Sequence, residues 1–170
     1  KKALRVAEKA VEPNHQDVAQ SLNNLAVLYG VKGNRARAES LFKRALAIDE
    51  EDLGPDHPEV ATDLNNLAML YYAKGQYAQA EPLFKRALAI REKALGPDHP
   101  DLTKILNPLA RLYDNQGLDA KAGPLFKRVL AIEEKAFGVL GHHPVIGRTD
   151  GPDNVDVAID VVNTVLRLLG

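Results

Sequence analysis

The sequence has no cysteine and no tryptophan, and no apolar stretch in it approaches the length of a membrane span. Without thiols the chain cannot form disulfides, thiolate metal sites or a thiol nucleophile. A membrane span needs about 20 consecutive apolar residues, so we expect no insertion into a bilayer. The net charge is only −1, which argues against general attraction to nucleic acid or anionic lipid. A chain without cysteine suits a reducing compartment, and we expect a cytoplasmic protein.

Sequence signatures of enzymes are missing as well. There is no Gly-rich phosphate loop, no HExxH motif and no paired-carboxylate motif. The two serines, Ser21 and Ser40, have no setting typical of a nucleophile. His142, His143 and Asp150 lie in a Gly/Pro-rich stretch, but adjacent histidines usually point apart and no further ligand is specified. We therefore expect no catalysis, no metal site and no cofactor.

What the chain does contain is an internal repeat. His15, His57 and His99 follow one another at intervals of 42 residues. The same interval relates Asn23, Asn65 and Asn107; Tyr29, Tyr71 and Tyr113; Gly33, Gly75 and Gly117; and Phe42, Phe84 and Phe126. Because many residue types keep one register, the sequence predicts an array of equivalent structural units.

Each unit carries two helical patterns. In the second unit one helix face is formed at the i, i+3, i+4, i+7 spacing by Leu64, Leu67, Ala68 and Tyr71. Gly75 then supplies the permissive backbone that a helix end needs. A second helix is predicted to begin near Tyr77, and its two neighbouring apolar stripes indicate that it is covered on two sides.

The segment "LGPDHPE" at 53–59 joins one unit to the next. Gly54 is predicted to end a helix, and Pro55 prevents the helix from continuing. We expect Asp56 to cap the next helix and Pro58 to lie in its first turn. We interpret the recurrent histidine here as a hydrogen-bonded residue that fixes the angle between units. Metal binding by these histidines is disfavoured because they are a whole repeat apart.

The phrases "LNNLA", "AEPLFKRALAI" and "GPDHP", with the order of apolar residues around Gly75, resemble the tetratricopeptide repeat. The usual unit has about 34 residues, and the longer unit here resembles the variant found in kinesin light chains. The resemblance implies an all-α fold of antiparallel helix pairs stacked in a right-handed superhelix. It also implies that the first helices line a concave groove that binds peptides or protein segments, which in kinesin light chains is a cargo-recognition surface.

The resemblance covers residues 1–137. We expect 1–12 to be the second helix of a truncated leading unit, and 15–54, 57–96 and 99–137 to be three complete units. A Gly/Pro-rich insert follows at 138–150, and 151–170 resumes the pattern as a degenerate fourth first-helix or a cap. The chain begins without Met in the middle of a helical pattern, so we expect it to be a piece of a longer protein.

A helical wheel gives the residues that face the predicted groove. With Leu64 pointing to the core, one flank lies between roughly 80° and 180°, where tetratricopeptide repeats place their ligand contacts. This flank comprises Gln20, Asn23, Val27 and Val31 in the first unit, Thr62, Asn65, Met69, Tyr72 and Ala73 in the second, and Lys104, Asn107, Arg111, Asp114 and Asn115 in the third.

The recurrent asparagine of this flank has two possible roles. An amide offers donors and an acceptor, so a row formed by Asn23, Asn65 and Asn107 suits the main chain of an extended peptide. The alternative is that these amides bond to the neighbouring repeat and only set the stack. For the adjacent Asn24 and Asn66 we prefer the structural role.

The remaining flank residues suggest which peptide is bound. Lys104 and Arg111 suit an acidic residue of the ligand, and Met69 and Tyr72 suit an apolar or aromatic one. We therefore hypothesise a peptide with an acidic residue and an apolar anchor. The alternative is that both cations are ordinary solvated charges.

Two broader functions compete with peptide binding. In one alternative, the array is a structural or assembly element of a larger signalling protein. The array would then self-associate through its convex face or through 151–170. A weaker alternative is an enzyme built around the 138–150 insert. Neither nucleic acid nor a membrane is expected as a partner.

Overall fold

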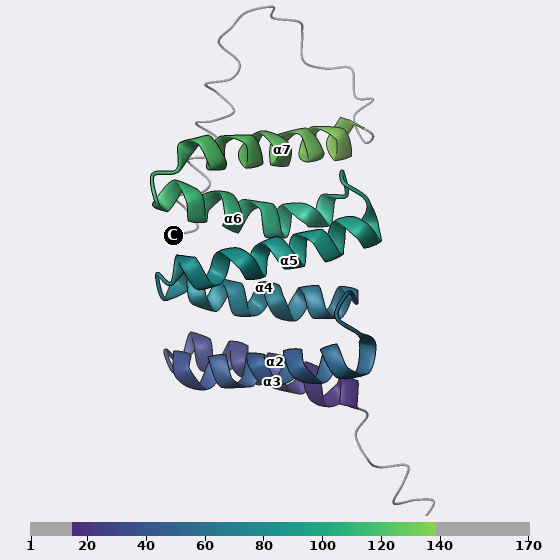
Figure 1. Cartoon of the computed structure of the whole chain (residues 1–170), viewed down its shortest axis with the longest axis vertical. Helices are drawn as coiled ribbons and strands as arrows, with labels where there is room; N and C mark the ends of the chain where they lie inside the picture. The colour runs from purple at the N-terminus through teal and green to yellow at the C-terminus, as the bar shows by residue number, and fades with distance from the viewer. Residues whose placement is uncertain (1–14, 139–170) are drawn as a thin grey trace, which may run out of the picture. The chain divides into compact units, whose positions relative to one another are not determined.

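The computed structural model describes residues 15–138, and all the regular secondary structure in this part of the chain is helical (Figure 1). Its helices are α2 (His15–Val31), α3 (Arg35–Leu53), α4 (Pro58–Ala73), α5 (Tyr77–Leu95), the short 3-10 helix η1 (Pro100–Leu102), α6 (Thr103–Asn115) and α7 (Asp119–Gly138). The leading helix expected at 1–12, the insert after residue 138 and the fourth first-helix at 151–170 lie outside the described residues.

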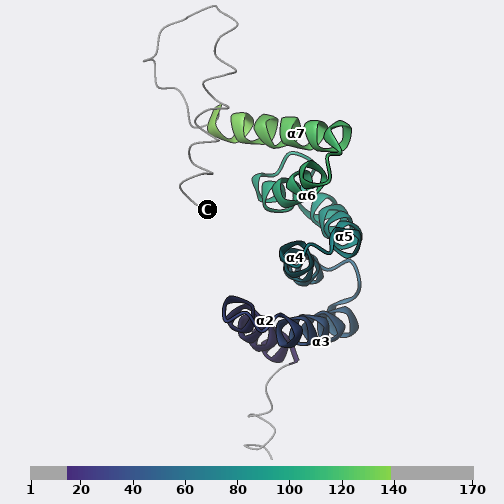
Figure 2. The ribbon, with the colours of Figure 1, turned by 90° about the vertical axis from the view of Figure 1, so that its left-hand side faces the viewer.

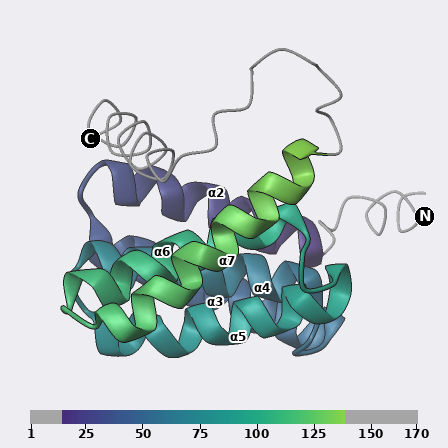
Figure 3. The same ribbon diagram turned by 90° about the horizontal axis from the view of Figure 1, so that it is seen from above.

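Consecutive helices of the described part pack against one another as an α-solenoid, which confirms the predicted fold class. α2 packs on α3, α4 on α5 and α6 on α7, and these antiparallel pairs are joined because α3 packs on α4 and α5 on α6. Seen from the side, α2, α4 and α6 lie to the left of α3 and α5 (Figure 2), and the view from above shows the same layers (Figure 3). First helices therefore share one side of the stack.

The predicted apolar face of each first helix forms the core. In α4, Leu64 and Ala68 are fully buried, and Leu67 and Tyr71 are nearly so. From the second helix of the same unit, Phe84 is fully buried in the same cluster. Full burial of such a side chain stabilises the fold by about 2–3 kcal/mol, so the repeated apolar register is the main source of stability.

Glycines end the helices as predicted. Gly75 follows α4 with φ +70°, and Gly54 follows α3 with φ +90°. Side chains with a Cβ rarely adopt this region, so glycine removes a steric cost that other residues would carry. The second helix of this unit begins at Tyr77, also as predicted.

The expected cap between units is wrong by one residue. α4 is capped by His57, whose Nδ1 accepts a 3.2 Å hydrogen bond from the backbone N–H of Glu59. His57 has the extended backbone of a capping residue, which carries its ring over the first turn. Asp56 instead forms an ion pair with Lys93 at 3.2 Å. Pro58 occupies the first turn as predicted.

An arginine of each later second helix ties neighbouring units together. Arg86 donates to the Pro55 carbonyl at 3.0 Å and pairs with Glu50 at 2.6 Å. Arg128 donates to the Pro97 carbonyl at 2.7 Å and pairs with a glutamate of α5, also from the preceding unit. We call this two-part contact the arginine clasp. It recurs in the same register at both joints between described units.

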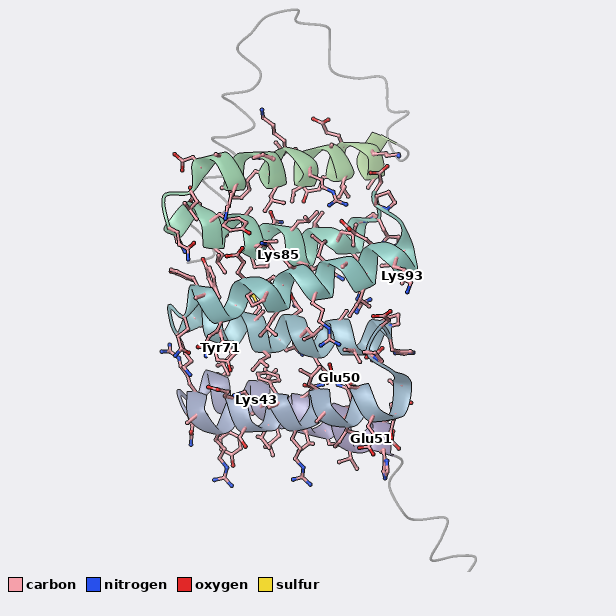
Figure 4. All side chains as sticks on the ribbon, viewed as in Figure 1. Lys43, Glu50, Glu51, Tyr71, Lys85 and Lys93 are labelled. Carbon is pink, nitrogen blue, oxygen red and sulfur yellow. The ribbon has the colours of Figure 1, made fainter. Side chains whose placement is uncertain are left out.

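A second polar contact lies at the opposite ends of the helices. The Tyr71 hydroxyl donates to Glu39 Oε1 at 2.9 Å, and Lys74 binds the other oxygen at 2.7 Å. Lys43 reaches the same tyrosine, with its Nζ 5.9 Å from the ring centre, and Figure 4 shows this pair between α3 and α4. Hydrogen bonds from Lys43 and Lys74 hold the pKa of Glu39 down at about 2.

Within the described residues, no helix has the length and apolarity needed to cross a membrane.

Candidate functional site

The predicted flank lies on the three first helices, α2, α4 and α6. Most of its side chains are exposed, namely Gln20, Val27, Val31, Met69, Ala73, Lys104, Arg111, Asp114 and Asn115. Four are partly buried, namely Thr62, Asn65, Tyr72 and Asn107. Asn23 differs from all of them, because only 7% of its surface is exposed.

Asn23 contacts the neighbouring repeat. Its Nδ2 donates a 2.5 Å hydrogen bond to Oδ1 of Asp63 on α4, which is itself only 1% exposed. This is the stacking contact that sequence analysis named as the alternative role for the recurrent asparagine. The amide donor of Asn23 is thus used inside the joint between the first two repeats.

A second carboxyl group lies beside Asp63. Asp49 of α3 is also buried, and its negative charge raises the pKa of Asp63 across the joint between the repeats. Burial raises the pKa of Asp63 to about 7, although the hydrogen bond from Asn23 acts in the opposite direction. Burial raises the pKa of Asp49 too. The pair therefore holds a proton under mildly acidic conditions, and we call it the carboxyl pair.

Asn65 occupies the same repeat position as Asn23 but has a different neighbour. The residue equivalent to Asp63 in the next repeat is Ile105, which offers no acceptor. No hydrogen bond engages the Asn65 side chain within the described part of the chain, and its Oδ1 is buried without a partner. Asn107 of α6 likewise has no side-chain partner among residues 15–138. Two of the three recurrent amides are thus not used by the stack.

The two predicted cations are not equivalent. Lys104 already pairs with Asp101 at 2.7 Å, and both side chains are exposed. Arg111 is exposed and forms no ion pair with any described residue. Asp114 lies one turn further along the same helix and is also exposed. Arg111 is therefore the flank cation that forms no ion pair with an acidic residue among those described.

Two residues that sequence analysis missed reach this flank from α5. Arg91 donates a 2.6 Å hydrogen bond to Oγ1 of Thr62, and so places a cation next to the first helix. Its position is occupied by Asp49 in the preceding repeat and Glu133 in the following one. The sequence therefore contained a signal for Arg91, because the charge at this repeat position changes sign from one unit to the next.

The other missed residue is Tyr77, which begins α5. Its ring centre lies 5.6 Å from that of Tyr72, and the planes are tilted by 49°. Asn115 of α6 donates to the Tyr72 hydroxyl at 2.8 Å and to the Tyr77 hydroxyl at 3.4 Å. These contacts place an aromatic cluster across the second joint, one turn beyond the exposed Met69. Within residues 15–138, no group of three or more metal-binding side chains accompanies it.

Comparisons with known proteins give one family. A profile described as tetratricopeptide repeat matches residues 1–51, 17–93 and 64–135. Among solved structures the chain is similar to BtubC (BKLC) from P. vanneervenii, with 28% identity, a TM-score of 0.68, and coverage of 88% of this chain and 59% of that chain. No curated protein sequence matches the chain.

Two further similar structures are of one protein, whose own TPR-like repeats are described as nearly identical. One is a putative kinesin light chain with TPR-like repeats from Podospora anserina, with 28% identity, a TM-score of 0.65, and coverage of 83% of this chain and 62% of that chain. A variant of that protein with one substituted residue gives 28% identity, a TM-score of 0.65, and coverage of 82% and 61%. The chain thus spans about three fifths of the length of these proteins.

Proposed function

Since the chain belongs to the tetratricopeptide repeat family and its repeats are of the kinesin-light-chain-like type, we propose that it binds an extended peptide of a partner protein along α4 and α6. The contact surface would be the flank formed by Asn65, Met69, Tyr72, Asn107 and Arg111, here named the amide flank. At the coarser level the chain is a protein-interaction repeat module.

The observation that carries this proposal is the difference between equivalent asparagines. Asn23 donates its amide to a buried carboxyl, whereas Asn65 and Asn107 have no such partner within residues 15–138. An amide that the fold does not use remains able to donate to a peptide carbonyl. Because Asn65 and Asn107 are one repeat apart, they suit two points along one extended main chain.

The neighbouring side chains define the ligand's chemistry. Arg111 is exposed without an ion pair among the described residues, so it is available for a carboxylate of the ligand. Met69 is exposed beside the aromatic cluster, and its flexible thioether adapts to apolar side chains. The proposed ligand is therefore a peptide with one apolar anchor and one acidic residue. Asn23 takes no part in binding it.

A random-peptide display selection against the purified chain tests the proposal. The counter-target carries Asn65→Ala and Arg111→Glu on the amide flank. A matched control carries Asn24→Ala and Arg35→Glu, which make the same chemical changes at exposed positions outside it. We expect an enriched acidic–apolar motif that binds the parent and the control but loses at least about tenfold in affinity on the counter-target.

Two results would contradict this function. One is an enriched motif that binds the counter-target as well as the parent, because the amide flank would then not be the binding surface. The other is a folded sample that enriches no motif. That outcome favours the assembly alternative, which sedimentation of chains with and without residues 151–170 then examines.

A further inference from the structure

The joint between the first two repeats, here called the first joint, contains polar groups that the next joint does not have. Asn23 of α2 donates to Asp63 of α4, and Asp49 of α3 lies beside them, so three helices each contribute one buried polar side chain. In the second joint the equivalents of the two carboxyl groups are Ile105 and Arg91. Any effect of the carboxyl pair therefore belongs to the first joint.

The buried oxygens of the first joint lack hydrogen-bond donors. Oδ1 of Asn23, Oδ1 of Asp49 and Oδ2 of Asp63 are each buried without a partner within the described part of the chain. A proton on either carboxyl group turns an acceptor into a donor, whereas ionisation of both leaves two negative charges in a buried place. Burial outweighs the opposing effect of the Asn23 hydrogen bond and raises the pKa of Asp63 to about 7. The first joint is thus more favourable with one proton than with none.

The charged groups nearest the carboxyl pair are mostly acidic. Besides burial, the negative charges of Glu59 in the first turn of α4 and Asp52 at the end of α3 raise the pKa of Asp49. Glu59 acts on Asp63 in the same direction. His57, which caps α4, acts in the opposite direction on Asp49. These neighbours therefore add to the cost of ionising the pair.

Cations of the neighbouring helices do not neutralise the pair. From α2, His15 pairs with Asp52 at 3.1 Å. From α5, Arg91 donates to Thr62 at 2.6 Å. No lysine or arginine among residues 15–138 forms an ion pair with either carboxyl group of the pair. The charge of the carboxyl pair is therefore set by its protons.

Other contacts fix α3 to the second unit. Arg86 of α5 pairs with Glu50 near one end of α3, and Tyr71 and Lys74 bind Glu39 near the other end (Figure 4). Arginine stays charged in proteins, and the pKa of Glu39 is about 2. α3 is therefore held to α4 and α5 by groups outside the carboxyl pair.

The contact between α2 and α4 differs from these. α2 packs on its partner α3, but its contact with α4 is sparser than the contact of α4 with α6. The hydrogen bond from Asn23 to Asp63 joins the two helices at the carboxyl pair. A change in the charge of the pair therefore acts where the first joint has little other packing.

We propose that the first joint is a pH-dependent hinge, closed when the carboxyl pair holds a proton and open when both carboxyl groups are ionised. Two ionised groups gain hydration by reaching water, so the first unit tilts about α3 and α2 moves away from α4. The second joint has no such pair and keeps its geometry. The hinge is independent of the proposed peptide ligand, because every group that drives it belongs to the fold.

Distances between spin labels on paired cysteines measure the hinge, since the chain has no cysteine of its own. Val27→Cys with Met69→Cys reports the distance between α2 and α4 from equivalent exposed positions. Ala47→Cys with Ala89→Cys reports the distance between α3 and α5, also from exposed equivalents. From pH 5 to pH 8 we expect the first distance to grow by about 2 Å or more and the second to stay constant.

Substitutions separate the carboxyl pair from other groups that titrate. Asp63→Asn keeps the shape and the acceptor oxygen of the side chain without its charge, so the distance between α2 and α4 should stay at its acidic value throughout. Asp49→Asn removes the other charge and should act in the same way. The matched control Asp114→Asn, at an exposed position, should keep the full change. His15→Gln and His57→Asn remove the neighbouring imidazoles and should keep it too.

Three results would overturn the inference. An unchanged distance between α2 and α4 at the two pH values would mean that the first joint does not move. A change that survives both Asp63→Asn and Asp49→Asn would assign the movement to other groups. An equal change between α3 and α5 would mean that the two units separate as a whole, with no pivot at α3.

Discussion

The Asn23 amide donates its hydrogen bond to Asp63 across the joint between the first two repeats, and the charge of Asp49 raises the pKa of the same Asp63. All three side chains are buried. The next joint contains no equivalent of this polar contact, because Ile105 occupies the position that Asp63 has in the first joint. The two joints thus share the same apolar packing and arginine clasp but differ in the polar group at their centre.

The carboxyl pair should make stability depend on pH. Asp63 has a pKa of about 7 in the fold and near 3.8 when unfolded, so the folded state holds an extra proton between these values. Its stabilising effect is complete below about pH 4 and is lost as the pH rises through about 7. Asp63→Asn should therefore raise the free energy of unfolding at pH 8 by on the order of 2 kcal/mol, with little gain at pH 4.

Urea unfolding of Asp63→Asn and of the parent between pH 4 and 8 checks this expectation. The exposed Asp114→Asn serves as the matched control. Parallel stability curves for Asp63→Asn and the parent would show that the carboxyl pair does not retain a proton on folding.

The equivalent asparagines should respond differently to the same substitution. Asn23→Ala removes the amide donor of a buried carboxyl and should lower the free energy of unfolding by about 1–3 kcal/mol. Asn65→Ala breaks no hydrogen bond among the described residues and should change it by less than about 0.5 kcal/mol. Urea denaturation at pH 7 gives both values. Equal losses in the two variants would mean that Asn65 also supports the stack.

The register of the array was predictable from the sequence, whereas its polar contacts were not. The helix pairs, the buried face around Leu64 and the glycine ends follow from one apolar pattern repeated at a fixed interval. The contact from Asn23 to Asp63 joins positions that are not equivalent in the repeat, so comparing equivalent residues does not reveal it. Asp63 did stand out, since Ser21 and Ile105 occupy its equivalents.

The same distinction applies to the candidate site. A helical wheel identifies which first-helix residues lie on one flank, but it contains no second helix and no neighbouring unit. It therefore did not show that Arg91 of α5 reaches Thr62. That contact depends on how closely α5 approaches α4, and the distance is set by packing. The pair of Asp101 and Lys104 is different, because the two residues are three apart in the chain and their spacing was visible in the sequence.

Charge reversal on α6 should distinguish the two flank cations. Arg111→Glu should weaken an acidic peptide obtained by selection about tenfold or more at low salt, because it turns an attraction into a repulsion. Lys104→Glu should cost only a few-fold, since Asp101 already offsets the lysine charge. Fluorescence anisotropy at low and high salt measures both losses, and the Arg111 effect should shrink as salt rises. A larger effect for Lys104→Glu would reverse these assignments.

Two glycines should respond in opposite directions to alanine. Gly54→Ala places a Cβ at φ +90° and should lower the free energy of unfolding by about 1 kcal/mol. Gly123→Ala lies inside α7, where a Cβ meets no atom within 4 Å, and should raise it by roughly 0.5–1 kcal/mol. Thermal unfolding of both variants measures the difference. A stabilising Gly54→Ala would mean that this turn changes conformation easily.

The arginine clasp lets the array change length by whole units. Excision of residues 55–96 would bring Pro97 directly behind Gly54, and Glu50 would take over as the acidic partner of Arg128. The same excision would leave Asp49 facing Ile105, a buried acid without a carboxyl neighbour. Recombination between repeats therefore preserves the shared contacts and disrupts the one joint that has its own chemistry. In this chain the carboxyl pair forms only when the first repeat directly precedes the second.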